Sequence, residues 1–303
     1  MKKIIPILFL FLIACSEKQE QIQPESSEKF KVISVNYSLH YFAQRIGGEL
    51  VDVQYPVPAG VDPAYWVPTA EDIILYQDAD VILLNGAGYA KWVEKVSLPP
   101  SKMINTSFLF KQNYIALDEG QTHSHGPEGE HEHKGFAFTT WLDFKNAIIQ
   151  AQEVYKALSN LLPESEQTFG SNFQSLKNDL DNLNKNMKDA AIKFEGEILF
   201  ASHPVYQYLS AGYNMNIRSF HWEPDQLPDD MMWEEFEKAF ASTKTALMLW
   251  EDTPLSEVND RLINYSIKPI VFNPCGNKPK EGDFISVMKK NIDLLNSSSK
   301  ISK

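Results

Sequence analysis

Short apolar runs alternate with amphipathic segments in two separate stretches of the chain. The predicted strands cover residues 30–35, 51–57, 81–84 and 103–105 in the first stretch and 197–201, 217–220, 246–250 and 270–272 in the second. Segments with helical spacing, such as 39–46 and 70–77, lie between them. This alternation predicts an α/β protein with two lobes, each a parallel sheet covered by helices.

A long amphipathic segment separates the two stretches. Its apolar positions recur at spacings of three and four residues, which places them on one helix face: Phe173, Leu176, Leu180, Leu183, Met187 and Ala190. A shorter predicted helix before it ends at Pro163. We therefore expect one long rigid helix over 164–194, joining an N-terminal lobe (29–163) to a C-terminal lobe (195–300).

The amino end has the pattern of an export signal. Lys2 and Lys3 precede an apolar run over 4–13 that is too short to span a bilayer. The run ends in Leu-Ile-Ala-Cys-Ser, which resembles the lipobox of bacterial lipoproteins and implies lipidation of Cys15; an ordinary cleaved signal is the alternative. We expect a lipoprotein signal peptide over 1–15, a polar flexible tether over 16–28, and an exported chain anchored to a bacterial membrane, either periplasmic or on the cell surface.

Composition narrows the function classes. The formal net charge of −12 disfavours phosphate backbones, so we expect no binding to nucleic acid. The two cysteines, Cys15 and Cys275, cannot form the disulfide framework of a small secreted scaffold. If Cys15 carries a lipid, Cys275 remains alone, either as a small buried hydrophobe or as a functional thiol.

Chemically active side chains follow the predicted strands of the C-terminal lobe. In open α/β sheets, ligands bind outside the carboxyl ends of the strands. The loops at that edge contain His203, His221, Glu223, Glu251, Asp252 and Cys275. Imidazole, carboxylate and thiol groups are ligands for zinc, although any one of them could instead cap a helix. The corresponding loops of the N-terminal lobe contain mostly neutral groups, including the turn over 58–63.

A histidine-rich loop over 119–135 lies in the N-terminal lobe, before the linking helix. It contains His123, His125, His131 and His133, interleaved with Gly, Pro and Glu. Such a tract can collect zinc, copper or nickel loosely. The entropy lost on ordering it would keep the affinity modest. The alternative is a solvated loop that is rich in His by chance.

Seven segments, in order, resemble the zinc and manganese solute-binding lipoproteins of bacterial ABC importers, known as the cluster A-I or cluster 9 family. Besides the His loop they are VNYSLHYFAQRIGG (35–48), GVDPAYWVPTAEDI (60–73), ADVILLNGAGYAKWVEKV (79–96), WLDFKNA (141–147), SHPVYQYLSAGY (202–213) and GDFISVMKKNIDLL (282–295). The resemblance implies two α/β lobes bridged by a rigid helix. It also implies capture of a divalent metal for a membrane permease and its ATPase, without catalysis. We expect a monomer.

Three of the four ligand positions that the resemblance implies are changed. Ala64, Thr139 and Asn273 stand where the family has ligands, and only His203 matches. Closed zinc sites need about four donors. Our hypothesis is a relocated site, in which His203 is joined by two or three of the C-terminal-lobe candidates and helped by a loop histidine. Zinc is the first choice of metal, with manganese, copper and nickel as alternatives.

Other functions remain open. A cleft that has lost metal could bind an organic ligand in an aromatic pocket, for which the candidates are Tyr37, Tyr65, Trp66, Tyr89, Trp141 and Trp222. A surface lipoprotein that buffers metal or mediates adhesion is also compatible with the lipobox. We do not expect an enzyme, because the sequence contains no His-Glu-x-x-His, Gly-x-Ser-x-Gly or Walker motif.

Overall fold

The computed structural model describes residues 29–117, 122–124, 130–132, 135–243 and 245–298. The predicted signal peptide, the tether and Cys15 therefore lie outside the described residues, as do His125 and His133. No helix in the described ranges is both long and apolar enough to cross a membrane.

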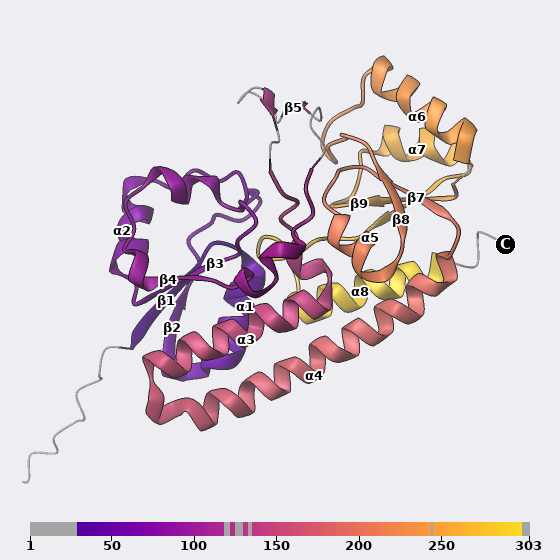
Figure 1. Cartoon of the computed structure of the whole chain (residues 1–303). Coiled ribbons are helices and arrows are strands. Elements are labelled where there is room, and N and C mark those ends of the chain that lie inside the picture. The colour runs from indigo at the N-terminus through magenta and orange to yellow at the C-terminus, as the bar shows by residue number, and fades with distance from the viewer. Residues whose placement is uncertain (1–28, 118–121, 125–129, 133–134, 244, 299–303) are drawn as a thin grey trace, which may run out of the picture.

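Two four-stranded parallel sheets form the centres of two lobes (Figure 1). The first has the order β2-β1-β3-β4, with β1 Phe30–Ser34, β2 Val51–Gln54, β3 Val81–Leu84 and β4 Met103–Asn105. The second has the order β10-β9-β7-β8, with β7 Ile198–Ala201, β8 Asn216–Ser219, β9 Leu247–Trp250 and β10 Lys268–Val271. Strand β2 is shorter than predicted because Pro56 and Pro58 follow it, and proline cannot donate to a sheet ladder.

Eight α-helices cover these sheets in the described ranges: α1 Tyr37–Gly47, α2 Ala70–Asp78, α3 Phe144–Leu161, α4 Glu166–Ala191, α5 Gln207–Tyr213, α6 Asp230–Thr243, α7 Ser256–Asn264 and α8 Phe284–Ser298. Helix α1 begins where the Asn36 side chain accepts the amide of Leu39. The Asp143 carboxylate accepts the amide of Lys145 in the same way at the start of α3.

Helix α4 is the long helix that the apolar stripe predicts. It runs beneath both lobes (Figure 1) and packs against α1 and α3 of the first lobe and α8 of the second. Leu176, Leu180, Leu183 and Met187 are buried. Phe173, at the start of the stripe, is only partly buried and stacks on Tyr155 with ring centroids 5.3 Å apart. One buried face along 26 residues therefore ties the two lobes to a common support.

The apolar core is shared between the lobes. One cluster of buried residues extends from the first sheet through α4 to β7 and α8. A second cluster lies in the C-terminal lobe around Trp222, which is 1% exposed and contacts Trp233 and Phe236. Trp222 is thus a core residue, which corrects its assignment to an aromatic ligand pocket.

His40 is a buried titratable residue in α1. It is 8% exposed and lies against the rings of Tyr37 and Tyr55, with centroids 5.9 and 5.5 Å away. Burial, reinforced by the positive charge of Lys278, lowers the pKa of His40 from 6.5 to about 4. The folded protein therefore keeps this imidazole neutral over a range in which the unfolded chain protonates it.

This difference predicts an acid sensitivity. As pH falls from 6.5 to 4, the unfolded state binds a proton at His40 that the folded state does not, so the free energy of unfolding falls by roughly 3 kcal/mol. His40→Phe should lose this part of the pH dependence. Urea denaturation at pH 7 and pH 4.5 measures it, and an unchanged slope between the two pH values in His40→Phe would contradict the assignment.

Candidate metal-binding cleft

A cleft of about 1480 Å³ opens between the lobes. From the N-terminal lobe it is lined by Asp62, Tyr65, Tyr89, Phe138 and Trp141, and from the C-terminal lobe by His203, Glu223, Glu251, Asp252 and Asn273, among others. The C-terminal donors all lie in loops that follow β7, β8, β9 and β10, as expected for the carboxyl edge of a parallel sheet. Four of the predicted donors, His203, Glu223, Glu251 and Asp252, therefore share this cleft.

Three carboxylates from the two lobes influence one another there. Burial, followed by the negative charges of Asp62 and Glu223, raises the pKa of Glu251 from 4.5 to about 8. Burial, followed by the charges of Asp62, Glu251 and Glu223, also raises the pKa of Tyr65. Asp62 belongs to the N-terminal lobe, whereas both glutamates belong to the C-terminal lobe. Carboxylates of both lobes therefore act on Glu251 across the cleft.

His203 lies beside this acidic group. It is 7% exposed, and its Nδ1 is 3.5 Å from Oε1 of Glu223. The two residues come from the loops after β7 and β8. An imidazole beside carboxylates is a donor combination that zinc and manganese accept.

The donors surround the cleft without converging. Within the described residues, no group of three or more His, Cys, Asp or Glu side chains is placed so that it could hold a metal ion. The relocated site of the sequence hypothesis is therefore not preassembled in this conformation. The chemistry of the donors fits a divalent ion, but their spacing requires the lobes or side chains to move closer.

The three changed family positions have structural roles. Thr139 Oγ1 donates to the carbonyl of Val205, which joins the two lobes. Asn273 Oδ1 accepts the amide of Cys275 at 2.7 Å. Ala64 is buried, and its amide donates to Oδ1 of Asp62 at 2.8 Å. These positions now supply packing and hydrogen bonds in place of ligands.

Asp62 is the cleft residue that the sequence pattern missed. The turn over 58–63 is mostly neutral, and Ala64 stands where the resemblance implies a histidine ligand. The acid in Asp62-Pro63, two residues earlier, was the available signal. It supplies a carboxylate from the same turn.

Two predicted ligands lie outside the cleft lining, which corrects their assignment. Cys275 is 1% exposed, and burial, with a contribution from Asp283, raises the pKa of its thiol to about 12. A thiol must lose its proton to bind zinc, so this environment opposes coordination. The ring of His221 lies edge-on to His203, with centroids 6.0 Å apart, and His221 does not line the cleft.

The His-rich loop contains a short hairpin in its described part. Strands β5 Thr122–Ser124 and β6 Glu130–Glu132 pair antiparallel, and the register places His123 opposite His131. Figure 1 shows β5 above the gap between the lobes. Loose metal collection by this loop stays a prediction.

Only some of the predicted aromatic residues line the cleft. Tyr65, Tyr89 and Trp141 line the cleft. Trp66 packs edge-to-face on Trp92 in the core, with centroids 6.0 Å apart, and Tyr37, like Trp222, lies outside the lining. The aromatic pocket is therefore smaller than the sequence suggests.

Comparison with known proteins identifies relatives along the whole described chain. The family model described as zinc-uptake complex component A, periplasmic (ZnuA), matches residues 32–298. The chain is 24% identical over 310 residues to the zinc-binding lipoprotein AdcA of Streptococcus pneumoniae, which covers 97% of this chain and 60% of AdcA. It is 27% identical over 315 residues to the manganese ABC transporter substrate-binding lipoprotein PsaA of Streptococcus mitis, which covers 97% and 98%. The chain thus spans about 60% of AdcA and nearly all of PsaA.

Solved structures share the fold. The Zn(II)-bound ZnuA-like domain of S. pneumoniae AdcA superposes with a TM-score of 0.76 at 21% identity, covering 89% of this chain and 99% of that domain. The periplasmic zinc-binding protein TroA from Treponema pallidum gives 0.74 at 18% identity, covering 89% and 99%. The predicted two-lobed α/β fold class is confirmed.

The raised pKa of Glu251 predicts how the stability of the metal-free protein changes with pH. Between pH 4.5 and pH 8 the folded state keeps a proton that the unfolded state has lost, so the free energy of unfolding decreases as pH rises. Glu251→Gln should remove this decrease and gain stability over the native protein between pH 5 and pH 8, by on the order of 3 kcal/mol.

Denaturant titrations of chelator-treated protein at the two pH values measure this gain. Glu164→Gln, a change of an exposed glutamate before α4, should have no such effect. Equal pH dependence in Glu251→Gln and the native protein would contradict the acidic cluster.

Proposed function

Because this chain belongs to the zinc-uptake complex component A family, we propose that it captures a divalent metal ion in the cleft between its lobes and delivers the ion to an ABC permease. The observation that carries this proposal is the juxtaposition of carboxylates from both lobes beside a buried histidine. The names of AdcA and PsaA, a zinc-binding and a manganese-transporter lipoprotein, support the same role.

Asp62 of the N-terminal lobe and His203, Glu223 and Glu251 of the C-terminal lobe form the proposed ligand set. Four donors satisfy the usual coordination number of zinc. A dication among these residues would replace the proton on Glu251 and offset the repulsion between the carboxylates. Because the donors come from both lobes, the ion would draw the lobes together as it binds.

The proposed donors also bear on the choice of metal. One imidazole and three carboxylates form an oxygen-rich set, which suits manganese as well as zinc. Excluding the Cys275 thiol removes the soft ligand that would have favoured copper(I). Zinc remains our first choice, and manganese is the strongest competitor.

The proposed cellular setting follows from the family. Delivery requires a membrane permease and its ATPase, and the predicted lipid on Cys15 would hold the chain at the outer face of a membrane. PsaA and AdcA are both named as lipoproteins. We propose binding and release without catalysis by a monomeric chain.

A second candidate function follows from the size and lining of the cleft. Its volume of about 1480 Å³ far exceeds that of a bare ion, and Tyr65, Tyr89 and Trp141 provide apolar surface. An organic ligand could occupy this space. Titration with zinc separates the two functions, because a cleft specialised for an organic molecule has no tight site for the free ion.

Replacing the cleft histidine tests the metal proposal. Purified mature protein titrated with zinc by calorimetry should show one tight site, and His203→Ala should weaken it by roughly a hundredfold or more, since loss of even an outer partner of a ligand costs ten- to hundredfold. Asn259→Ala is the control, because the Asn259 side chain donates to Asp260 on α7, and it should bind nearly as tightly as the native protein. Undiminished affinity in His203→Ala would contradict the proposal.

The histidine-rich loop should contribute separately. Deleting residues 123–133 should remove weak zinc sites and leave the tight one, because the proposed ligands lie outside this segment. The same calorimetric titration counts both classes of site. A deletion that abolished the tight site would place the principal ligands in the loop.

A further inference from the structure

The segment over 274–283 leaves the C-terminal lobe after β10 and lies against the N-terminal lobe. We call it the strap. Trp141 Nε1 donates to the carbonyl of Pro274 at 2.7 Å, and the amide of Tyr37 donates to the carbonyl of Gly276 at 2.9 Å. Both donors belong to the N-terminal lobe. The strap therefore crosses the lobe boundary through defined hydrogen bonds.

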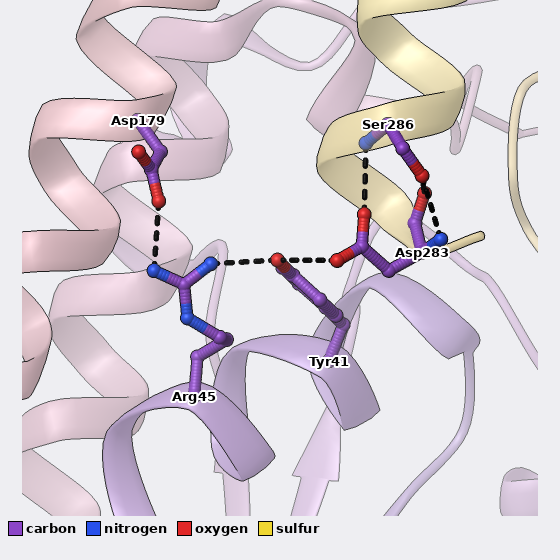
Figure 2. Close-up of polar contacts among 5 residues, drawn as sticks. All are labelled: Tyr41, Arg45, Asp179, Asp283 and Ser286. Carbon is purple, nitrogen blue, oxygen red and sulfur yellow. Dashed lines mark hydrogen bonds and ion pairs between the residues drawn. The ribbon is translucent and has the colours of Figure 1, made fainter.

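The far end of the strap is anchored to two helices (Figure 2). Asp283 and Ser286 cap the start of α8 through reciprocal hydrogen bonds. The hydroxyl of Tyr41, on α1, donates to Asp283 Oδ2 at 3.3 Å. Arg45 donates to the Tyr41 hydroxyl and to Asp179 of α4, both at 2.7 Å. This chain of contacts links the strap to α1 and to the long helix.

Asn277 lies between these two anchors and holds the turn that leads to Asp62. Its side-chain amide donates to the carbonyls of Pro58 and Val61, at 2.8 and 2.7 Å. Those carbonyls lie on either side of Gly60, which has a φ of +79°. One amide thus spans the whole turn from a segment of the opposite lobe.

Side-chain packing does little to fix the turn. The side chains over 58–62 are exposed, so they gain little from packing, and a glycine adds backbone freedom. Within the turn, the amide of Val61 reaches the carbonyl of Pro58 at 3.3 Å. A ligand on a loose turn must be ordered before it binds, which weakens affinity.

We propose that Asn277 is a positioning residue for metal binding, which fixes the 58–61 turn so that the carboxylate of Asp62 faces Glu223 and Glu251. This inference rests on the proposed function. Because Asn277 belongs to the strap, the C-terminal lobe sets the position of the N-terminal lobe's metal ligand. The Asn277 side chain is engaged by backbone groups: its amide donates to two carbonyls, and its Oδ1 accepts the amide of Lys278.

A double-mutant cycle tests this role with zinc as the probe. Asn277→Ala should weaken zinc binding about fivefold, the loss expected for hydrogen bonds of this kind. In an Asp62→Ala background the same change should have no further effect, because Asn277 acts through Asp62. Asn259→Ala is the matched control, since the Asn259 side chain donates to Asp260 on α7, and it should bind zinc like the native protein.

Hydrogen exchange on metal-free protein gives a readout that does not depend on the metal site. Asn277→Ala should speed exchange about fivefold at the amides of Ala64, Tyr65 and Trp66, which bond back to Asp62. Exchange elsewhere in the N-terminal lobe should not change.

The outcomes separate the two proposals. Unchanged zinc affinity in Asn277→Ala, or an equal loss with and without Asp62, would overturn the positioning role. Faster exchange at the turn, together with native affinity in Asp62→Ala, would overturn the proposed metal site and leave the strap as a scaffold.

Discussion

Like charges brought together across one cleft are the constraint on which this structure depends. Asp62, Glu223 and Glu251 come from two lobes, and burial, followed by the charges of Asp62 and Glu223, holds the pKa of Glu251 near 8. The raised pKa of Glu251 means that its ionised form is unfavourable in the metal-free protein. A bound dication would instead favour the ionised carboxylates. The proposed function follows from this electrostatic imbalance more directly than from any single ligand.

The scaffold decides how far the donors can approach. Helix α4 supports both lobes, and a continuous apolar core passes between them. The Thr139 hydroxyl and the Trp141 indole add hydrogen bonds across the boundary. Thr139, where the resemblance implies a ligand, is thus a point of attachment between the lobes. In our proposal Asp62, two residues before Ala64, supplies a ligand from the same turn, provided that the turn is held in place.

Much of the fold could be predicted because its signals are local. Buried parallel strands read as short apolar runs, and the bounds of β3 and β4 match those runs. The stripe on α4 also follows from helical spacing. The site was harder to predict than the fold. The sequence places donors at a sheet edge but does not show which of them face the cleft. Cys275 and Trp222 turn into the core, whereas Asp62 reaches the cleft from a turn that looked neutral.

Anomalous diffraction at the zinc edge, from crystals of the mature protein grown with one equivalent of zinc, would locate the bound ion. We expect one dominant peak in the cleft, within coordination distance of His203 and of carboxylates from both lobes. A cleft without a peak, with zinc bound only by the segment over 123–133, would contradict the proposed site.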